Sequence, residues 1–308
     1  MRIVSLLPAA TEIVCALGLR DELVGVTHEC DWPPDVVGLP VMTRNALDLH
    51  GATSREIHQR VGAAVHGGSA IYQLDDDALE AADADLILTQ ELCAVCAVGY
   101  REVSDAVRAL EMESTVISLE PTSVEGILNT IATVGAMADA EDAAVDLVGR
   151  LRERLGAIEA KAQERREAGF VGPRVVGLEW LDPPFAVGHW VPDQVRRAGG
   201  WDLLGLDGEA ARETTWDAVA EVDPDLLLVM PCGYHLGETV AEWAATPRPD
   251  WIADLNAIRR GHVIALDGSS YFSRPGPRVV DGIEMLAEIF DPEAFRDLSP
   301  ATGWTPIA

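Results

Sequence analysis

The sequence predicts an α/β protein built from two Rossmann-like α/β lobes joined by a single long helix. Three observations predict this fold. Strand-like apolar runs alternate with helical segments in residues 1–121, an entirely helical stretch fills residues 122–169, and the alternation resumes in residues 170–308. Such alternation favours parallel sheets covered by helices on both faces. We therefore expect an N-terminal lobe, a helical connecting segment and a C-terminal lobe with these boundaries.

The first lobe opens on a buried-strand pattern at residues 2–6. Its predicted strands are residues 2–6, 23–26, 85–89 and 115–119. Its predicted helices are residues 11–17, 54–66 and 100–110, with a further short helix that starts at the acidic residues 75–77. Acidic side chains stabilise the first turn of a helix, which supports that start. Residues 27–52, rich in Pro and Gly, are predicted to form a long loop.

The central stretch contains two amphipathic helical patterns in series. The first begins at Ser123 and spaces its apolar residues by three and four positions, and residues 139–141 interrupt it. The second pattern continues to Gly169, and a helix of ~27 residues would span ~40 Å. This second helix is the predicted connection between the lobes, although a helical hairpin inside one domain is the alternative interpretation.

The second lobe repeats the order of the first. Its predicted strands are residues 174–178, 226–230 and 263–266, its predicted helices are residues 193–198, 216–221 and 279–290, and residues 179–192 are predicted as a loop. Residues 77–86 align without gaps to residues 217–226, with five of ten positions identical. Shared composition of helix-turn-strand units could produce this match by chance. If the repeat is genuine, the two lobes are structurally related and the central helices separate them.

Charge excludes several classes of partner. The chain carries 51 acidic and 23 basic residues, a net charge of −28, and Lys161 is its only lysine. So acidic a surface repels nucleic acid phosphates and anionic membranes. No run of 18 apolar residues predicts a membrane-spanning helix, and no secretory signal is visible at residues 1–7, so we expect a cytoplasmic, acidic protein without membrane insertion.

The loops after the predicted strands concentrate residues that can carry chemistry. In parallel α/β sheets ligands bind at the carboxyl ends of the strands. Four of the five cysteines and three of the seven histidines lie in these loops. Such a concentration predicts a ligand site. The candidate ligand-binding residues are His28, Glu29, Trp32, Glu91, Trp180, Phe185, His189, Trp190, Tyr234, Tyr271, Phe272 and Arg274.

Cys93 and Cys96 form a Cys-x-x-Cys pair with three interpretations. Zinc or another soft metal would need two further ligands, for which Cys30, Cys232 and His28 are candidates. A redox-active dithiol is a second interpretation, and two small packing residues are a third. The metal and redox interpretations imply an alternative function, in which the protein is a metal-dependent or thiol-dependent enzyme with the same fold.

Individual candidates also allow structural interpretations. His189 could be an axial ligand to a cobalt or iron macrocycle, or a hydrogen-bonded histidine of the site. Arg274 could hold an anionic group or fix a surface turn. The tryptophans could stack on a planar ligand or pack in the core. The familiar nucleophile-elbow, phosphate-loop and zinc-protease motifs are missing, and Glu29, Glu91 and Glu179 are the remaining candidates for general bases.

Five short motifs in a fixed order resemble one family. They are Ser5-Leu-Leu-Pro-Ala-Ala-Thr11-Glu12, Val24-Gly-Val26 with Asp31-Trp32-Pro33-Pro34, Asp83-x-Asp85, Pro183-Pro184-Phe185 and Ala198-Gly-Gly200. Together they resemble the cobalamin-binding substrate-binding proteins of ABC importers, within the iron-siderophore and cobalamin group, over residues 2–290. The resemblance implies two lobes on one helical backbone, the helical backbone metal receptor architecture, with a ligand held between the lobes and a possible ABC permease partner.

The motifs His28-Glu-Cys-Asp, Gly188-His-Trp and Phe272-Ser-Arg-Pro resemble a leaderless subgroup of that family. We therefore expect a non-catalytic binding protein for cobalamin or a related corrinoid or metal macrocycle. Aromatic residues would stack on the ligand, His189 or His28 could reach the metal, and Arg274 could hold an anionic side chain. The remaining alternative is the substrate-binding component of an ABC importer.

Overall fold

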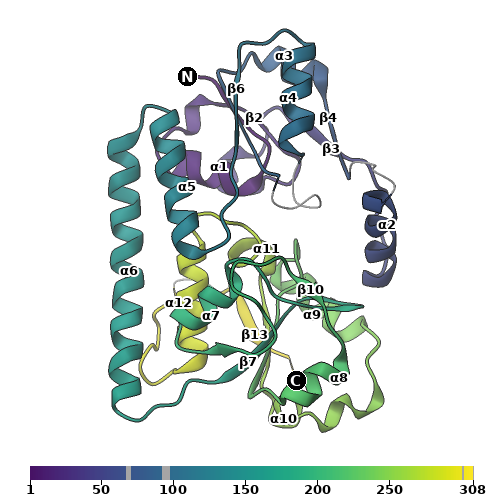
Figure 1. The fold of residues 1–308 in the computed structure, drawn as a ribbon, viewed down its shortest axis with the longest axis vertical. Helices are drawn as coiled ribbons and strands as arrows, with labels where there is room; N and C mark the ends of the chain where they lie inside the picture. Colours follow the sequence, from purple (N-terminus) through teal and green to yellow (C-terminus); the bar gives the residue numbers. More distant parts are fainter. Residues whose placement is uncertain (67–70, 92–97, 300–301, 308) are drawn as a thin grey trace. The chain divides into compact units, whose positions relative to one another are not determined.

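The computed structural model of the chain describes residues 1–66, 71–91, 98–299 and 302–307. Residues 1–121 with 125–149 form one compact unit, called unit 1, and residues 122–124 with 150–308 form unit 2 (Figure 1). The long helix α6, Glu141–Glu167, contributes residues to both units. The segment 122–169, which we expected to be a separate connecting part, is thus divided between the two.

Unit 1 is organised around a four-stranded parallel sheet in the order β2-β1-β5-β6. Its strands are β1 (Ile3–Ser5), β2 (Leu23–Val26), β5 (Leu86–Thr89) and β6 (Thr115–Ser118). Its helices are α1 (Pro8–Ala16), α2 (Ser54–His66), α3 (Asp76–Ala82), α4 (Tyr100–Ala109) and most of α5 (Val124–Met137). Residues of β1, β5, α3 and α4 share one hydrophobic core cluster. The order of these elements follows the predicted alternation.

Residues 27–52, predicted as one loop, are more structured than expected. They contain a short 3-10 helix, Pro34–Val36, and the strand β3 (Thr43–Asn45). β3 pairs antiparallel with β4 (Tyr72–Leu74), in a two-stranded sheet of its own. The prediction was wrong here because three-residue strands with exposed polar side chains lack the apolar run that marks a buried strand.

Unit 2 contains a larger mixed sheet in the order β10-β8-β7-β11-β12-β13, with β9 also paired to β7. Its strands are β7 (Arg174–Leu181), β8 (Pro184–Ala186), β9 (Trp201–Asp202), β10 (Arg212–Glu213), β11 (Leu226–Val229), β12 (Val263–Leu266) and β13 (Trp304–Pro306). Its helices are α7 (Val191–Arg197), α8 (Trp216–Val222), α9 (Leu236–Ala245), α10 (Asn256–Arg259), α11 (Gly268–Tyr271) and α12 (Val279–Phe290). β7, β11 and β12 are parallel, so their carboxyl ends meet at one edge.

The loop predicted at residues 179–192 is instead largely structured. β7 continues to Leu181 and turns back into β8, and the two strands pair antiparallel with Trp180 opposite Phe185. α7 then begins at Val191, two residues earlier than predicted. The sequence missed this hairpin because Asp182 and two prolines interrupt the apolar pattern, which ordinarily ends a strand.

The two units repeat one polar arrangement at the start of their sheets. In unit 1 the Arg2 N–H donates to the Asp85 carboxylate (2.7 Å), and the Arg2 guanidinium donates to the Ala82 carbonyl at the end of α3. In unit 2 the Arg174 N–H donates to Asp225 (2.9 Å), and its guanidinium donates to the Val222 carbonyl at the end of α8. Basic groups at helix C-termini satisfy exposed carbonyls. Both aspartates lie inside the ten-residue match in the sequence.

The backbone between helix and strand repeats as well. Asp83 after α3 has φ 45°, and Asp223 after α8 has φ 42°. A non-glycine residue in this left-handed region is uncommon, and aspartate is among the residues that tolerate it. An equivalent N-cap begins each helix, with Asp75 accepting from Ala78 N and Thr215 accepting from Ala218 N. These matched details favour a genuine internal repeat over a chance match that arises from shared composition.

Helices α5 and α6 are separated by a tight turn. Asp139 in this turn has φ 52°, and the Ala140 N–H donates to the Gly135 carbonyl (2.8 Å). A Cβ atom at Gly135 would lie 2.4 Å from the Cβ of Ala144, so only glycine permits this approach of the two helices. The predicted interruption at residues 139–141 is therefore the turn that connects α5 to α6.

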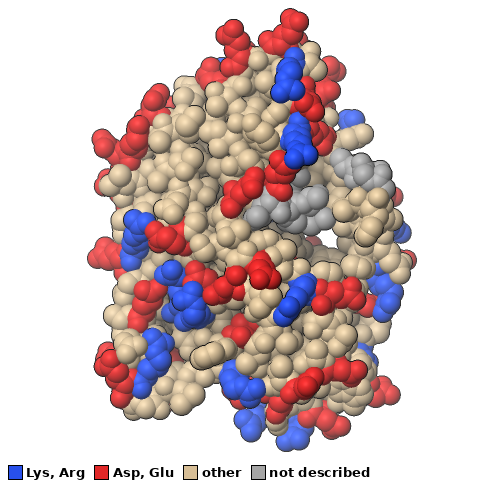
Figure 2. Space-filling model, viewed as in Figure 1, with Lys and Arg blue, Asp and Glu red and all other residues tan. Residues whose placement is uncertain are grey.

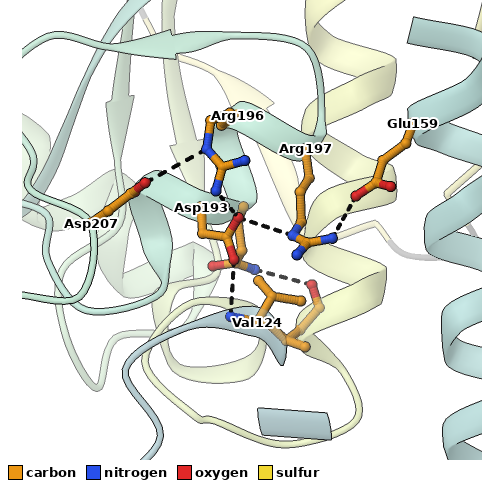
Figure 3. Close-up of polar contacts among 8 residues, drawn as sticks. Val124, Glu159, Asp193, Arg196, Arg197 and Asp207 are labelled. Carbon is orange, nitrogen blue, oxygen red and sulfur yellow. Dashed lines mark hydrogen bonds and ion pairs between the residues drawn. The ribbon is translucent and has the colours of Figure 1, made fainter. Parts of the chain in front are cut away.

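Asp193 is the centre of a buried polar cluster in unit 2 (Figure 3). Its carboxylate accepts from Val124 N (3.1 Å), Arg196 Nη2 (2.5 Å) and Arg197 Nε (2.9 Å). Arg197 also contacts Glu159 of α6 at 2.5 Å. Because Asp193 is almost fully buried, its charge is stabilised by these donors and not by water.

We expect Asp193→Ala to destabilise unit 2 by ~3 kcal/mol, because it leaves the buried Val124 N–H without its acceptor and removes one of the two carboxylates that Arg197 contacts. Urea denaturation followed by tryptophan fluorescence measures this, since seven of the eight tryptophans lie in unit 2. Asp207→Ala is the matched control, because Asp207 is 56% exposed and lies 3.6 Å from Arg196. The control should cost under ~1 kcal/mol, and equal losses for both variants would contradict this account of the cluster.

Candidate functional site

The carboxyl edge of the unit 2 sheet brings together three of the predicted loops. Glu179 and Trp180 lie at the end of β7, Cys232 and Tyr234 follow β11, and the segment from Asp267 to Tyr271 follows β12. Backbone hydrogen bonds join the loops: Cys232 N donates to the Glu179 carbonyl (3.0 Å), and Ser269 N donates to the Tyr234 carbonyl (2.9 Å). This edge is the candidate site of unit 2.

An aromatic side chain of β7 and one of the loop after β11 contact each other at this edge. The rings of Trp180 and Tyr234 meet edge to face, with centroids 5.7 Å apart. Both residues are half-buried, and Phe185 lies opposite Trp180 in the β7–β8 hairpin. Edge-to-face pairs are a favourable geometry, so the two rings hold each other in place. Half-buried rings of this kind can accept a planar ligand against their remaining surface.

His189, between the β7–β8 hairpin and α7, has an uncommon backbone conformation. Its φ is 50°, in the left-handed region. Its N–H donates to the Glu209 carbonyl (2.5 Å), and its own carbonyl accepts from Gly208 N (2.9 Å). Gly188 makes this possible, because a Cβ there would lie 2.3 Å from the Ala211 nitrogen. The segment 208–211 therefore fixes the position of the His189 backbone.

The imidazole of His189 is half-buried and stacks on the Trp190 ring, with centroids 5.7 Å apart and planes inclined by 29°. Burial lowers the pKa of His189, which favours the neutral imidazole. Trp190 is itself fixed, because its Nε1–H donates to the Phe272 carbonyl (2.9 Å). The site therefore contains a neutral, positioned imidazole.

Glu179 is the titratable carboxyl of this site. Burial raises its pKa from 4.5 to about 8, the neighbouring Cys232 adds to the rise, and a hydrogen bond from Gly188 N opposes it. The carboxyl group is therefore mainly protonated at neutral pH. A protonated carboxyl can donate one hydrogen bond and accept others, so it suits neutral amide groups.

Three of the predicted ligand contacts are buried in the described structure. Trp190, Phe272 and Arg274 are 6%, 2% and 8% exposed. Trp190 and Phe272 support the site by packing and by the hydrogen bond between them. Tyr271 is half-buried, and the Arg278 guanidinium lies over its ring, 5.5 Å from the centroid. As direct ligand contacts, all of these residues remain predictions.

Sequence reasoning did not select a polar cluster at the same edge. His235 Nδ1 lies 3.1 Å from Asp267 Oδ2, and Asp267 also accepts from Ser270 N (2.7 Å). The signal was Asp267 directly after a strand and before a short helix, which is an N-cap pattern. Ser270 Oγ lies 3.5 Å from the same His235 nitrogen that faces Asp267. A hydrolytic triad uses both ring nitrogens, so this cluster is no such triad.

The carboxyl edge of the unit 1 sheet holds other predicted residues. His28 Nδ1 contacts Thr43 Oγ1 (2.8 Å), and its Nε2 lies 3.2 Å from the Glu29 carboxylate. Trp32 is 45% exposed. Glu91 is exposed and lies 3.2 Å from Arg101. These side chains share one edge of unit 1, so the structure groups them as a second set of candidates.

The cysteine hypothesis is only partly addressed by the structure. Cys93 and Cys96 lie outside the described residues. Cys30 Sγ lies 3.0 Å from Thr11 Oγ1 in unit 1, and Cys232 belongs to unit 2. Within residues 1–66, 71–91, 98–299 and 302–307, no three His, Cys, Asp or Glu side chains are grouped closely enough to hold a metal ion. The zinc site therefore stays a prediction from the sequence.

The chain surface is strongly acidic in both units. Unit 1 contains 25 acidic and 7 basic residues, and unit 2 contains 26 and 16. On the face drawn in Figure 2, acidic side chains are distributed over both units, with arginines among them. In the described part of the chain, no helix combines the length and apolarity needed to cross a membrane.

The chain belongs to the periplasmic binding protein family, whose profile matches residues 3–269. An uncharacterized ABC transporter substrate-binding lipoprotein of Bacillus subtilis is 24% identical over 315 residues, covering 96% of this chain and 82% of that protein. A vitamin B12-binding protein of Vibrio cholerae is 22% identical over 288 residues, covering 92% and 87%. The predicted family resemblance is confirmed, and the chain is a substrate-binding protein.

Solved structures confirm the predicted α/β class with two lobes. A periplasmic heme-binding protein from Pseudomonas aeruginosa matches with a TM-score of 0.71 at 20% identity, covering 95% of this chain and 93% of that one. At this identity the likeness concerns the fold alone.

The raised pKa of Glu179 predicts a pH dependence of stability. The folded protein holds this proton more tightly than the unfolded chain, so stability falls as pH rises from about 4.5 to about 8. We expect wild type to lose up to ~1.4 kcal/mol per pH unit relative to Glu179→Gln in that range, with no further loss above it. Urea denaturation at several pH values and constant ionic strength measures the difference.

Glu221→Gln is the control for this measurement, because Glu221 is exposed on α8. Its stability should follow that of wild type at every pH. Parallel curves for wild type and Glu179→Gln would contradict the assignment of a raised pKa to Glu179.

Proposed function

We propose that this protein binds cobalamin or a related corrinoid, and that the carboxyl edge of unit 2 contributes part of the site. The observation that carries the proposal is the Trp180–Tyr234 pair, two half-buried rings that hold each other edge to face at the ends of β7 and β11. A corrin presents a broad, largely apolar face, which suits contact with aromatic rings. The names of relatives that bind vitamin B12 support the same ligand class.

The charge of the site favours a corrinoid over other metal macrocycles. A heme carries ionisable propionates, whereas the edge of a corrin carries neutral amide side chains. Glu179 is mainly protonated at neutral pH and can exchange hydrogen bonds with an amide. With a net charge of −28, the protein repels anionic ligands at long range. Both features support the neutral corrinoid periphery.

Calorimetric and absorbance titrations test the proposal directly. The purified protein is titrated separately with cyanocobalamin, hydroxocobalamin, dicyanocobinamide and hemin. We expect heat and a spectral change with at least one corrinoid, and weaker binding of hemin. Absence of binding by every corrinoid would overturn the proposal, and preferential binding of hemin would replace the corrinoid with a heme.

Trp180→Ala should weaken binding of the corrinoid by about 10-fold or more, because one face of the ligand loses its aromatic contact, at a cost of about 1.4 kcal/mol. Trp201→Ala is the matched control, since Trp201 is 73% exposed and pairs with Arg174 at the opposite end of β7. The dissociation constant of each variant is measured by calorimetry. Equal affinities for both variants would exclude Trp180 from the site.

An ABC permease is the partner that we propose for this binding protein, as the name of the Bacillus relative supports. Co-purification with ABC permeases of the same cell, with and without the corrinoid, tests this partnership. We expect a permease to be retained, and its absence under both conditions would contradict the proposal.

A further inference from the structure

A long excursion of the chain leaves and re-enters unit 1 at a single point. The strands β3 and β4 pair antiparallel with Asn45 opposite Tyr72, and beyond that pair the Ala46 N–H donates to the Ile71 carbonyl (2.8 Å). The base of the excursion is part of the fold, because Ile71 is only 4% exposed. Residues 46–66, which end with α2, are called the α2 arm. A connection of this length in a compact domain is usually functional.

Local hydrogen bonds stabilise the α2 arm. The Thr53 N–H donates to the Glu56 carboxylate (2.8 Å), and the Glu56 N–H donates to the Thr53 hydroxyl (3.3 Å), which together form a capping box. The Arg60 guanidinium donates to the Asp48 carbonyl inside the arm (2.6 Å). The structure describes every residue of α2, and of these only Ser54 is buried. In Figure 1, α2 stands apart from the other helices of unit 1. Segments with so little buried surface open most easily.

One face of α2 is apolar. Ile57, Val61 and Val65 recur every four residues and therefore lie on the same side of the helix. Ile57 and Val61 are half-buried, and Val65 is 43% exposed. Among the described residues, the hydrophobic core cluster that β1, β5, α3 and α4 share contains no residue of α2. A surface helix ordinarily packs its apolar face against the core. The face of α2 is instead suited to contact another molecule.

The base of the arm adjoins the candidate ligand residues of unit 1. The Thr43 hydroxyl of β3 contacts His28 Nδ1 (2.8 Å) and accepts from the His28 N–H (3.2 Å). The Tyr72 ring of β4 lies next to the His28 imidazole, with centroids 5.3 Å apart. The arm is therefore attached beside the carboxyl end of β2, and ligands of parallel sheets bind at the carboxyl ends of the strands.

The charge of the arm distinguishes between possible occupants of this face. Residues 46–66 contain two acidic and two basic residues, whereas unit 1 as a whole contains 25 and 7. Two copies of this chain, each with a net charge of −28, repel one another, so a second copy is a poor occupant. A neutral, partly apolar small molecule suits the uncharged arm, and a corrinoid has such a periphery.

We propose that α2 closes over the ligand at the carboxyl edge of unit 1 and slows its release. In the closed state the face formed by Ile57, Val61 and Val65 contacts the ligand, while the paired strands β3 and β4 stay in place. The inference rests on the proposed function, because a corrinoid is the ligand that α2 covers. Segments that close over a site retain the ligand and exclude water.

Hydrogen exchange of the full chain provides the first test. Amide exchange is followed by mass spectrometry with and without saturating cyanocobalamin. We expect peptides from residues 54–66 to exchange at least ~10-fold more slowly in the complex, because α2 gains contacts that hold it closed. Residues 256–262, at the amino ends of β11 and β12, are the internal reference and should exchange at the same rate in both samples.

A matched pair of substitutions separates the apolar contact from a change in charge. Val61→Asp places a carboxylate on the apolar face, and Ala63→Asp places the same group on the opposite, exposed side of α2. We expect cyanocobalamin to dissociate from Val61→Asp at least ~10-fold faster than from wild type, because the ligand loses an apolar contact. Ala63→Asp should keep the wild-type rate. Displacement by excess dicyanocobinamide, followed by stopped-flow absorbance, measures these rates.

Removal of the arm tests the closure without a substitution in α2. Replacing residues 47–70 by Asn-Gly creates a two-residue hairpin loop between Ala46 and Ile71, which antiparallel strands favour. Urea denaturation followed by circular dichroism should show that unit 1 keeps its stability. This variant should release cyanocobalamin at least as fast as Val61→Asp. If it does not fold, hydrogen exchange and the pair of aspartate variants decide.

The outcomes distinguish the two proposals. Binding of cyanocobalamin without protection of α2, or slow release that persists after removal of the arm, overturns the closure while corrinoid binding stands. Equal acceleration in Val61→Asp and Ala63→Asp would assign the effect to charge and overturn the closure as well. If no corrinoid binds to the wild-type protein, the proposed function fails and the closure fails with it.

Discussion

The rest of the fold depends on hydrogen bonds between the start of the first strand of each sheet and an aspartate that immediately precedes the neighbouring strand. The Arg2 N–H donates to the Asp85 carboxylate and the Asp85 N–H donates to the Arg2 carbonyl; Arg174 and Asp225 repeat both bonds. They set the register of β1 against β5 and of β7 against β11. Because each strand rises ~3.3 Å per residue, the register at the amino ends of the strands determines which residues lie at their carboxyl ends. The loops that carry the candidate site begin at these carboxyl ends.

The site in unit 2 follows from that register and from the β7–β8 hairpin. With Leu178 opposite Val229, the next residue along β7 is Glu179, and the loop after β11 places Cys232 beside it. The hairpin then returns the chain to Gly188, whose N–H reaches the Glu179 carboxylate. Two neighbouring segments thus partly shield this carboxyl group from water. Its raised pKa is a consequence of topology more than of any nearby charge.

The sequence was sufficient for the parallel strands of both units, for the helices α1 to α8 and α12 and for a candidate internal repeat, because buried parallel strands and amphipathic helices leave strong periodic patterns. It missed the short strands β3, β4, β8, β9, β10 and β13 and the helices α9 to α11, which leave weaker patterns. It also placed His189 and Tyr234 in loops between a strand and a helix, whereas Trp180, predicted in a loop, lies within β7. It could not show that β7 turns back at Asp182, or that Trp190 and Phe272 are buried, since both depend on contacts between distant segments. The left-handed backbone of His189 is indicated in the sequence only by the preceding Gly188. The role of this glycine follows from the structure, where segment 208–211 packs against it.

His189 illustrates how energetic cost identifies function in this chain. A glycine would adopt its backbone conformation more easily. The protein instead has a half-buried histidine in left-handed backbone, and its ring stacks on Trp190. Strain of this kind costs on the order of 1–3 kcal/mol, a substantial part of the marginal stability of a folded domain. The surrounding structure maintains this conformation: the Glu209 carbonyl and the Gly208 N–H hold the His189 backbone, and the Phe272 carbonyl fixes the indole on which its ring stacks. The cost is therefore met by contacts from three separate segments of unit 2, and it keeps the imidazole at the edge of the candidate site.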